Sequence, residues 1–156
     1  MVVRKGEYVA RYVDGVEDEA VQPNGVDLTV EKIYRHEGDA VLLDDDYLLP
    51  ERTEIEARDG FYEVESDGYT VEYGEVIEIP ENHTGFVYPR SRLMRCGGML
   101  FSAVWDSGYR GKGEGGLWFQ TPAKIETGMR IGQIVFVETE ELSETYTGSH
   151  QGENIE

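Results

Sequence analysis

Short apolar runs that end at glycine, aspartate or proline recur along this chain, and they constrain its fold more than any other feature. Residues 25–30 alternate apolar and polar side chains, which is typical of a strand with one buried face. Residues 69–79 predict two strands separated by Gly74, and residues 117–119 and 131–137 predict buried strands. Together with nineteen glycines, this pattern predicts an all-β barrel or sandwich.

Helical signals are weak by comparison. The best candidate is a short helix over residues 92–96, with Ser91 before it and Gly97 after it. The length of 156 residues fits one domain, which we place at residues 1–140. The remaining residues 141–156 are polar and predict a flexible C-terminal tail, which either frays or orders over a ligand or a neighbouring subunit.

Acidic residues outnumber basic ones by 32 to 14, which gives a net charge of −18. Such self-repulsion is tolerated where salt screens it, so we expect a high-salt cytoplasm. The charge argues against a nucleic-acid polymer as partner, because binding to a phosphate backbone needs a basic face. The sequence contains no long apolar run and no signal peptide, so no membrane is expected as partner. The single cysteine, Cys96, excludes an internal disulfide and is expected to be buried.

Residues 82–105 contain no aspartate or glutamate, although the chain as a whole is very acidic. This window carries Arg90, Arg92 and Arg95, and Arg110 follows soon after. Arginine presents a planar set of donors that suits phosphate oxygens, and Ser91 adds a hydroxyl. The window therefore predicts a site for a small phosphorylated ligand, unless these arginines simply pair with surface carboxylates.

Asp106 ends the acid-free window within a turn over residues 105–111 that contains two glycines. A carboxylate beside a phosphate can orient and activate water for attack on phosphorus. Tyr109 in the same turn can lie flat against a sugar or a base. The plain alternative is a hairpin that carries an exposed aromatic residue.

Zinc chemistry is excluded because the three histidines are scattered and no second cysteine exists. Residues 44–46 are three aspartates, and we interpret them as a surface turn and not as a metal site. No Walker loop, dinucleotide-binding fingerprint or Gly-x-Ser-x-Gly motif is present.

Four blocks of the sequence resemble the motifs of the dUTPase and dCTP deaminase superfamily, and most closely the short archaeal dUTP diphosphatases. They follow one another in the family's order and span residues 22–133. They are Gln-Pro-Asn-Gly-Val-Asp-Leu at 22–28, Pro-Arg-Ser-Arg-Leu-Met-Arg at 89–95, Trp-Asp-Ser-Gly-Tyr-Arg-Gly at 105–111 and Gly-Met-Arg-Ile-Gly-Gln at 128–133.

The resemblance implies a homotrimer of distorted β-barrels, of the jelly-roll or β-clip type, with active sites between subunits. It implies hydrolysis of dUTP to dUMP and pyrophosphate, with Mg²⁺ held mainly by the triphosphate and with no dedicated metal ligands in the protein. Asp106 would orient the attacking water, assisted by Gln133, and Asp27 would support the site. Tyr109 would pack on the deoxyribose. The implied substrate-binding residues are Arg90, Ser91, Arg92, Arg95, Tyr109, Arg110, Tyr146 and Gln151.

Two departures from the family pattern bear on the reaction. Arg92 replaces the second serine of the Pro-Arg-Ser-Ser motif, and residues 146–152 resemble the tail of the deaminase-like branch with Ser149 and His150 substituted. The deaminases use a glutamate on the strand after the aspartate turn, where counting back from Thr121 places Trp118. An indole cannot shuttle protons, so the diphosphatase is favoured over a dCTP deaminase, either bifunctional or monofunctional. A non-catalytic nucleotide-binding regulator on the same fold is the third alternative.

Overall fold

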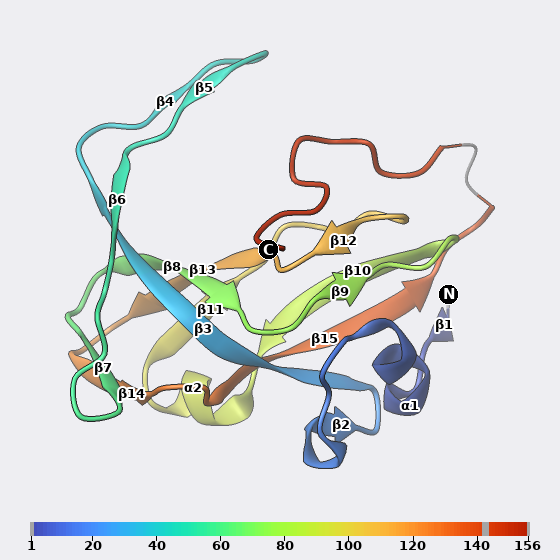
Figure 1. Cartoon of the computed structure of the whole chain (residues 1–156), viewed down its shortest axis with the longest axis horizontal. Coiled ribbons are helices and arrows are strands. Elements are labelled where there is room, and N and C mark those ends of the chain that lie inside the picture. The colour runs from blue at the N-terminus through green and yellow to red at the C-terminus, as the bar shows by residue number, and fades with distance from the viewer. Residues whose placement is uncertain (1, 142–143, 156) are drawn as a thin grey trace.

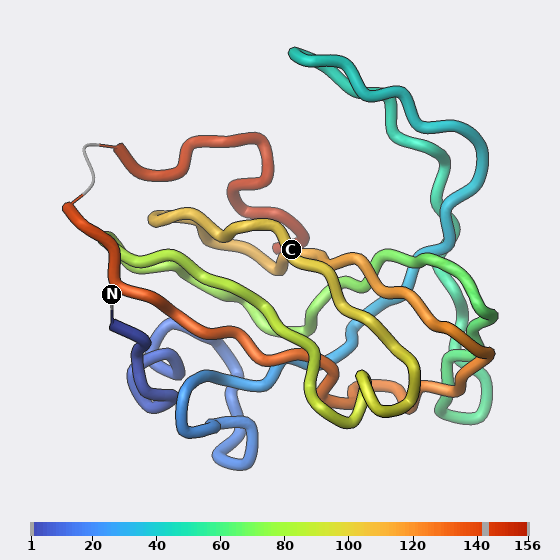
Figure 2. Tube along the Cα trace, turned by 180° about the vertical axis from the view of Figure 1, so that it is seen from behind, coloured from blue at the N-terminus to red at the C-terminus, as the bar shows by residue number. Residues whose placement is uncertain are grey.

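A curled antiparallel sheet forms most of the molecule, which is a computed structural model that describes residues 2–141 and 144–155 (Figures 1 and 2). Its main path runs in the order β1-β15-β3-β8-β13-β11, with β10 also paired to β15, and β2 and β6 also paired to β3. Three two-stranded pairs, β12-β9, β14-β7 and β4-β5, complete the strands. The all-β prediction is confirmed.

The elements follow one another along the chain with these bounds. They are β1 (Val2–Val3), α1 (Gly6–Val9), two 3₁₀ turns (Ala10–Tyr12 and Asp18–Ala20), β2 (Val21–Gln22), β3 (Gly25–Glu37), β4 (Val41–Leu42), β5 (Tyr47–Leu48), β6 (Glu51–Glu54), β7 (Phe61–Val64), β8 (Gly68–Tyr73), β9 (Ile77–Glu78), β10 (His83–Pro89), α2 (Ser91–Arg95), β11 (Gly98–Phe101), β12 (Arg110–Gly111), β13 (Glu114–Phe119), β14 (Ala123–Glu126) and β15 (Arg130–Glu138).

The long central strands β3 and β15 carry much of the core. Leu28 and Ile33 of β3 and Ile131, Ile134 and Phe136 of β15 are fully buried. The alternation predicted for β3 holds for its apolar side chains, but polar Asp27 is buried as well, with 1% of its surface exposed. A buried carboxylate requires polar partners, and these partners form the first half of the site described below.

The predicted helix is present as α2, but it begins one residue earlier than expected. Ser91 is its first residue and Arg90 occupies the N-cap position without a side-chain capping bond. Gly97 adopts a φ of 76° and ends the helix as predicted. Cys96 is exposed, so the expectation that it is buried was wrong. Across the described residues, no helix has the length and hydropathy that a membrane span requires.

Residues 38–50 form a two-stranded arm that leaves the body between β3 and β6 (Figures 1 and 2). Its turn contains the three aspartates at 44–46, where the Leu43 amide donates to the Asp46 carbonyl at 2.8 Å. The interpretation of these aspartates as a surface turn is confirmed.

Candidate active site

Pairing among three strands brings together residues that lie far apart in the sequence. Gln133 of β15 is the register partner of Asp27 on β3, and β10 pairs with the other edge of β15 as far as Pro89. Arg90 follows Pro89 directly, and its amide donates to the Ile131 carbonyl at 3.0 Å. The predicted residues Asp27, Arg90 and Gln133 therefore meet because their strands are neighbours.

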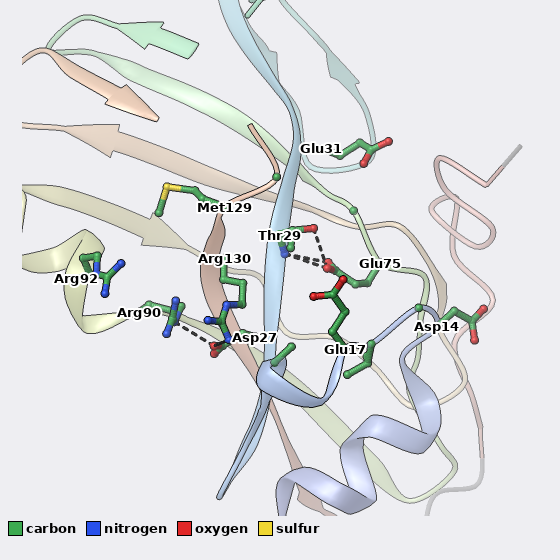
Figure 3. A pocket seen from close by; sticks show the side chains of 15 residues that line it. Asp14, Glu17, Asp27, Thr29, Glu31, Glu75, Arg90, Arg92, Met129 and Arg130 are labelled. Atoms are coloured by element: carbon green, nitrogen blue, oxygen red, sulfur yellow. Dashed lines mark hydrogen bonds and ion pairs between the residues drawn. The ribbon is translucent and has the colours of Figure 1, made fainter. Parts of the chain in front are cut away.

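The Asp27 carboxylate is surrounded by nitrogen donors (Figure 3). Arg90 Nε lies 3.1 Å and Arg130 Nη1 lies 3.5 Å from its Oδ2. Gln22 donates to the same oxygen at 3.0 Å, and Gln133 donates to Oδ1 at 3.3 Å. Two positive charges face one buried negative charge, so the cluster keeps a net positive charge that can attract an anion.

A cavity of about 540 Å³ opens beside this cluster. Asp27 and the arginines Arg90, Arg92 and Arg130 line one part of it (Figure 3). The rest of the lining includes Thr29 and four acidic residues, which are Asp14, Glu17, Glu31 and Glu75, so the positive charge is confined to the arginine side of the cavity. Glu75 accepts hydrogen bonds from the Thr29 amide, at 3.0 and 3.1 Å, and from the Thr29 hydroxyl at 2.7 Å. Burial raises the pKa of the Glu75 carboxyl despite these bonds.

The turn over residues 105–111 builds the second half of the site. Gly108 adopts a φ of 85°, which favours glycine, and the Tyr109 amide donates to the Asp106 carbonyl at 3.1 Å to close the turn. Ser107 is buried, and its hydroxyl bonds to the backbone of His83. These contacts anchor the turn to β10 and leave the Asp106 side chain exposed.

Asp106 and Tyr109 line a second cavity of about 240 Å³, together with Trp105. The ring of Tyr109 is packed edge-on against Trp105 at 5.2 Å and against Tyr146 at 5.6 Å between ring centres. Only 7% of the surface of Tyr109 is exposed. Burial, with the nearby Glu153 carboxylate, raises the pKa of the Tyr109 phenol.

The tail of the same chain forms one wall of this second cavity, through Tyr146, His150 and Glu153. The Tyr146 amide donates to the Ser107 carbonyl at 2.7 Å. The Gln151 side chain accepts from the Arg110 amide and donates to the Gly108 carbonyl, each at 2.9 Å. Burial and the charge of Glu114 raise the pKa of Glu153.

No residue of the described part of the chain lines both cavities, so Asp106 and the Asp27 cluster lie in separate cavities of one chain. Arg110 Nη2 pairs with Asp14, which lines the first cavity, at 3.3 Å. Ser91 and Arg95 are exposed on α2, outside the residues that line either cavity.

The sequence matches a known protein family over most of its length. The family model described as dCTP deaminase-like matches residues 3–139. The chain belongs to this family.

Two curated archaeal proteins are similar to most of this chain. A "probable deoxyuridine 5'-triphosphate nucleotidohydrolase" of Halobacterium salinarum is 39% identical over 97% of this chain and 95% of its own length. The deoxyuridine 5'-triphosphate nucleotidohydrolase of Methanocaldococcus jannaschii is 39% identical over 90% of this chain and 93% of its own length.

A solved structure supports the fold of this dCTP deaminase-like chain. The 2'-deoxycytidine 5'-triphosphate deaminase of Agrobacterium tumefaciens superposes with a TM-score of 0.67 at 14% identity. The match covers 86% of this chain and 47% of that one, so the chain spans about half the length of that protein. At this identity the likeness concerns the fold alone.

Trp118 and Glu114 of β13 lie in different surroundings. Trp118 is exposed on β13, outside the residues that line either cavity. Glu114, at the start of β13, lines the cavity of Asp106 and Tyr109. Its carboxylate is held by Arg52 through two bonds of 2.9 and 3.0 Å and by the Asn154 amide at 3.3 Å.

Sequence reasoning missed several residues of the site. Arg130 lies in the motif block at residues 128–133, and its positive charge three positions before Gln133 is the signal that indicates a second cation at the site. Glu75 lines the first cavity and Glu153 lines the second because the folded chain brings them there. No motif or spacing in the sequence indicates either residue.

Proposed function

We propose that this chain hydrolyses dUTP to dUMP and pyrophosphate. The observation that carries the proposal is the 39% identity, over most of both chains, to archaeal proteins named deoxyuridine 5'-triphosphate nucleotidohydrolase. The placement of Asp106 beside Tyr109 in one cavity supports it. The reaction needs a base, a sugar contact and a phosphate cradle, and the chain supplies a candidate for each.

Asp106 is the proposed base. Its exposed carboxylate accepts a proton from water and aims the oxygen at the α-phosphorus, and a positioned base of this kind contributes about 10²- to 10⁴-fold. Water attack breaks the bond between the α-phosphorus and the bridging oxygen. The released pyrophosphate takes the electron pair, and Asp106 gives up its proton to solvent.

The proposed phosphate cradle is the positive cluster on the first cavity. Arg90 and Arg92 line that cavity, and Ser91 and Arg95 extend the same surface along α2. Asp27 holds Arg90 in place, and Gln133 is tethered to the same carboxylate. Arginine suits this role because its fork of donors matches phosphate oxygens.

We propose that the complete site forms between chains of a homotrimer. In one chain the cavity of Asp106 and the cavity of Arg90 share none of the residues that the structure describes. A neighbouring copy that brings its Asp106 turn to this chain's arginine cluster would join base and phosphate cradle. In a closed ring every copy then donates one half-site and receives the other.

The donor set fits a magnesium ion that arrives with the nucleotide. Both oxygens of Asp27 already accept bonds from nitrogen donors, and no three His, Cys, Asp or Glu side chains of the described residues gather to hold a metal. Phosphate oxygens and water are the ligands that Mg²⁺ prefers. Bound in this way, the ion would neutralise charge on the phosphates.

The tail is proposed to move during the cycle. Tyr146 packs on the edge of Tyr109, and Tyr109 is almost fully buried. Contact between Tyr109 and a deoxyribose therefore requires Tyr146 to withdraw from the ring. Tyr146 and Gln151 would then close again over the bound nucleotide as one unit, since both belong to the segment that is docked on the turn.

The proposed setting is a cytoplasm of high salt. A net charge of −18 on 156 residues favours conditions in which ions screen the repulsion between carboxylates. Such a charge also disfavours nucleic-acid polymers as partners.

One observation favours a second candidate, a dCTP deaminase. Glu114 brings a carboxylate into the cavity of Asp106 and Tyr109, and a carboxylate is the group that proton transfer at cytosine would use. Its pairing with Arg52 opposes this role, because the Arg52 guanidinium already engages both oxygens of the Glu114 carboxylate.

One assay separates the candidates. The chain is incubated with dUTP or with dCTP, in Mg²⁺ and high salt, and the products are separated by ion-exchange chromatography. Pyrophosphate and dUMP from dUTP alone are expected. Formation of dUTP or dUMP from dCTP would overturn the diphosphatase assignment in favour of deamination. Binding of either nucleotide without turnover would indicate the regulatory alternative.

A further inference from the structure

The strands of the arm formed by residues 38–50 pair with each other and, among the described residues, with no other strand. Every residue from 35 to 49 is exposed, and the arm extends away from the body in both views (Figures 1 and 2). A lone two-stranded hairpin is at best marginally stable in water. An arm of this kind therefore gains stability only when another surface covers it.

The side chains of the arm are strongly apolar. Its large apolar residues are between 43% and 86% exposed, and they are Val41, Leu42, Leu43, Tyr47, Leu48 and Leu49. The strands β4 and β5 contain no acid, and the three aspartates are confined to the turn at 44–46. Single exposed apolar residues are normal, but a contiguous set marks an interaction surface.

A matching groove lies at the base of the arm, on the face of β8, β11 and β13. It has a volume of about 630 Å³, and its lining residues are His36, Gly68, Tyr69, Met99, Phe101, Gly116, Leu117 and Trp118. None of the described residues that line it is acidic, although the chain has 32 acidic residues. Gly68 and Gly116 present no side chain beside Trp118 and Phe101, which leaves room between the aromatic rings.

We propose that the arm of one copy of this chain fills the groove of a second copy. Each chain carries one arm and one groove, so a head-to-tail contact that closes into a ring leaves neither of them exposed. Charge favours this occupant: the strands β4 and β5 of the arm and the described lining of the groove are both free of acid, so they can meet on two chains of net charge −18 without carboxylates between them. The acids of the arm, at position 39 and in the turn at 44–46, lie outside these two strands. The aspartates at the tip disfavour an anionic membrane as the occupant. This contact is independent of nucleotide hydrolysis.

Cysteine pairing between two distinguishable chains tests the contact. Both chains carry Cys96→Ser, which removes the exposed natural thiol. One carries Leu48→Cys on the arm and the other carries Phe101→Cys in the groove. They are co-expressed with different tags, so that they assemble together, and are then oxidised mildly. A disulfide between the two chains is the expected product.

The matched control replaces Phe101→Cys by Lys124→Cys, which is exposed on β14 outside the groove. The proposal requires the pairing with residue 101 to exceed the pairing with residue 124 by at least about tenfold. Equal pairing with both positions, or no pairing with either, would overturn it.

Charge introduced on the arm provides a second, independent measurement. The double variant Leu42→Asp/Leu48→Asp keeps the body unchanged, and Asp45→Asn on the same arm is its control. Light scattering over a dilution series is expected to show dissociation of the double variant at a concentration at least tenfold higher than that of the control. Identical dissociation of the two variants, or a parent chain that is monomeric, would contradict the proposal. A separate sedimentation assay with anionic lipid vesicles tests a membrane as the occupant: if the double variant differs from the control only by losing vesicle binding, the proposal is also contradicted.

Discussion

Arg90 donates from Nε to the carboxylate of Asp27 at 3.1 Å, and the Asp27 side chain has no exposed surface whereas Arg90 keeps 28% of its own. The buried acid therefore fixes a guanidinium that still faces the cavity. This geometry gives Asp27 a positioning role: it orients the cation, and the cation is available to phosphate.

Asp27→Asn removes the charge while keeping the shape. We expect a loss of about 1–3 kcal/mol in the free energy of unfolding, because two partly hydrated arginines lose their buried partner. Weaker binding of a non-hydrolysable dUTP analogue should accompany it. Urea unfolding and calorimetric titration measure the two effects. Glu63→Gln, which removes an exposed carboxylate paired with Lys124, should leave nucleotide binding within error and should lower the free energy of unfolding by less than Asp27→Asn does. Equal effects of the two variants on both measurements would contradict the positioning role of Asp27.

Asp106→Asn should abolish turnover and leave nucleotide binding nearly intact. The amide cannot accept the proton of the attacking water, so kcat is expected to fall by about 10²- to 10⁴-fold. Pyrophosphate release under single-turnover conditions measures this, with Asp45→Asn on the exposed arm as the control. Turnover like that of the parent chain in Asp106→Asn would remove this carboxylate from the mechanism.

Gly113→Ala tests the packing behind the catalytic turn. A Cβ at position 113 would lie 2.4 Å from a ring carbon of Trp105, and Trp105 is buried between Tyr73 and Tyr109. Overpacking of this kind costs about 1–3 kcal/mol. Because Trp105 precedes Asp106, turnover should fall as well.

Thermal unfolding and pyrophosphate release are the measurements for this variant. Gly68→Ala is the matched control in a neighbouring strand, since its Cβ would meet only Trp118 at 3.9 Å. If Gly113→Ala and Gly68→Ala have the same midpoint of thermal unfolding and the same rate of pyrophosphate release, close packing against the Trp105 indole limits neither the stability nor the activity of the site.

Much of the fold was predictable because local patterns and tertiary structure agree. The runs at 25–30 and 131–137 became the central strands β3 and β15, and Gly97 ended α2 as expected. Strands β10 and β11 were missed, since arginines and glycines around them pointed to a ligand site and hid the periodicity. The exposure of Cys96 was missed because a short helix on the surface leaves its last turn open to solvent.

The candidate site was predictable as a set of residues but not as a geometry. Spacing indicated Asp27, Arg90 and Gln133, but only strand register shows that they share one carboxylate. Nothing in the sequence indicates that Asp106 lies in a separate cavity, because that depends on where the turn is anchored. The docking of Tyr146 on Tyr109 likewise arises from a backbone bond to Ser107 that carries no sequence signature.

Salt should stabilise this chain. Repulsion within a net charge of −18 acts over about 10 Å at 0.1 M salt and over about 3 Å at 1 M. The midpoint of thermal unfolding is therefore expected to rise as KCl increases from 0.1 to about 2 M. Circular dichroism measures it, with sucrose at matched osmolality as the control for non-ionic effects. A midpoint that falls or stays constant with KCl, while sucrose raises it, would show that charge repulsion is not the limiting term.

Glu75 should make stability fall as the pH rises. Its carboxyl has a pKa raised above the ordinary value of 4.5 by burial, with a further contribution from the charge of Glu31. Between 4.5 and the raised value, the folded chain holds a proton that the unfolded chain has released. Protons therefore favour the folded state, and the free energy of unfolding falls as the pH rises through this interval.

Glu75→Gln removes this titration. The free energy of unfolding of the variant, minus that of the parent chain, should grow more positive from pH 4.5 to 7, as measured by urea titration at each pH. Glu63→Gln is the matched control with the opposite sign, because the hydrogen bond and charge of Lys124 lower the pKa of Glu63. Its stabilising effect is fully present above pH 4.5 and is lost as the pH falls below that value, so the difference for Glu63→Gln should grow more negative as the pH rises towards 4.5 and stay constant from pH 4.5 to 7. A flat difference for Glu75→Gln would mean that Glu75 is ionised in the folded chain throughout, with Thr29 supplying enough hydrogen bonding to offset its burial.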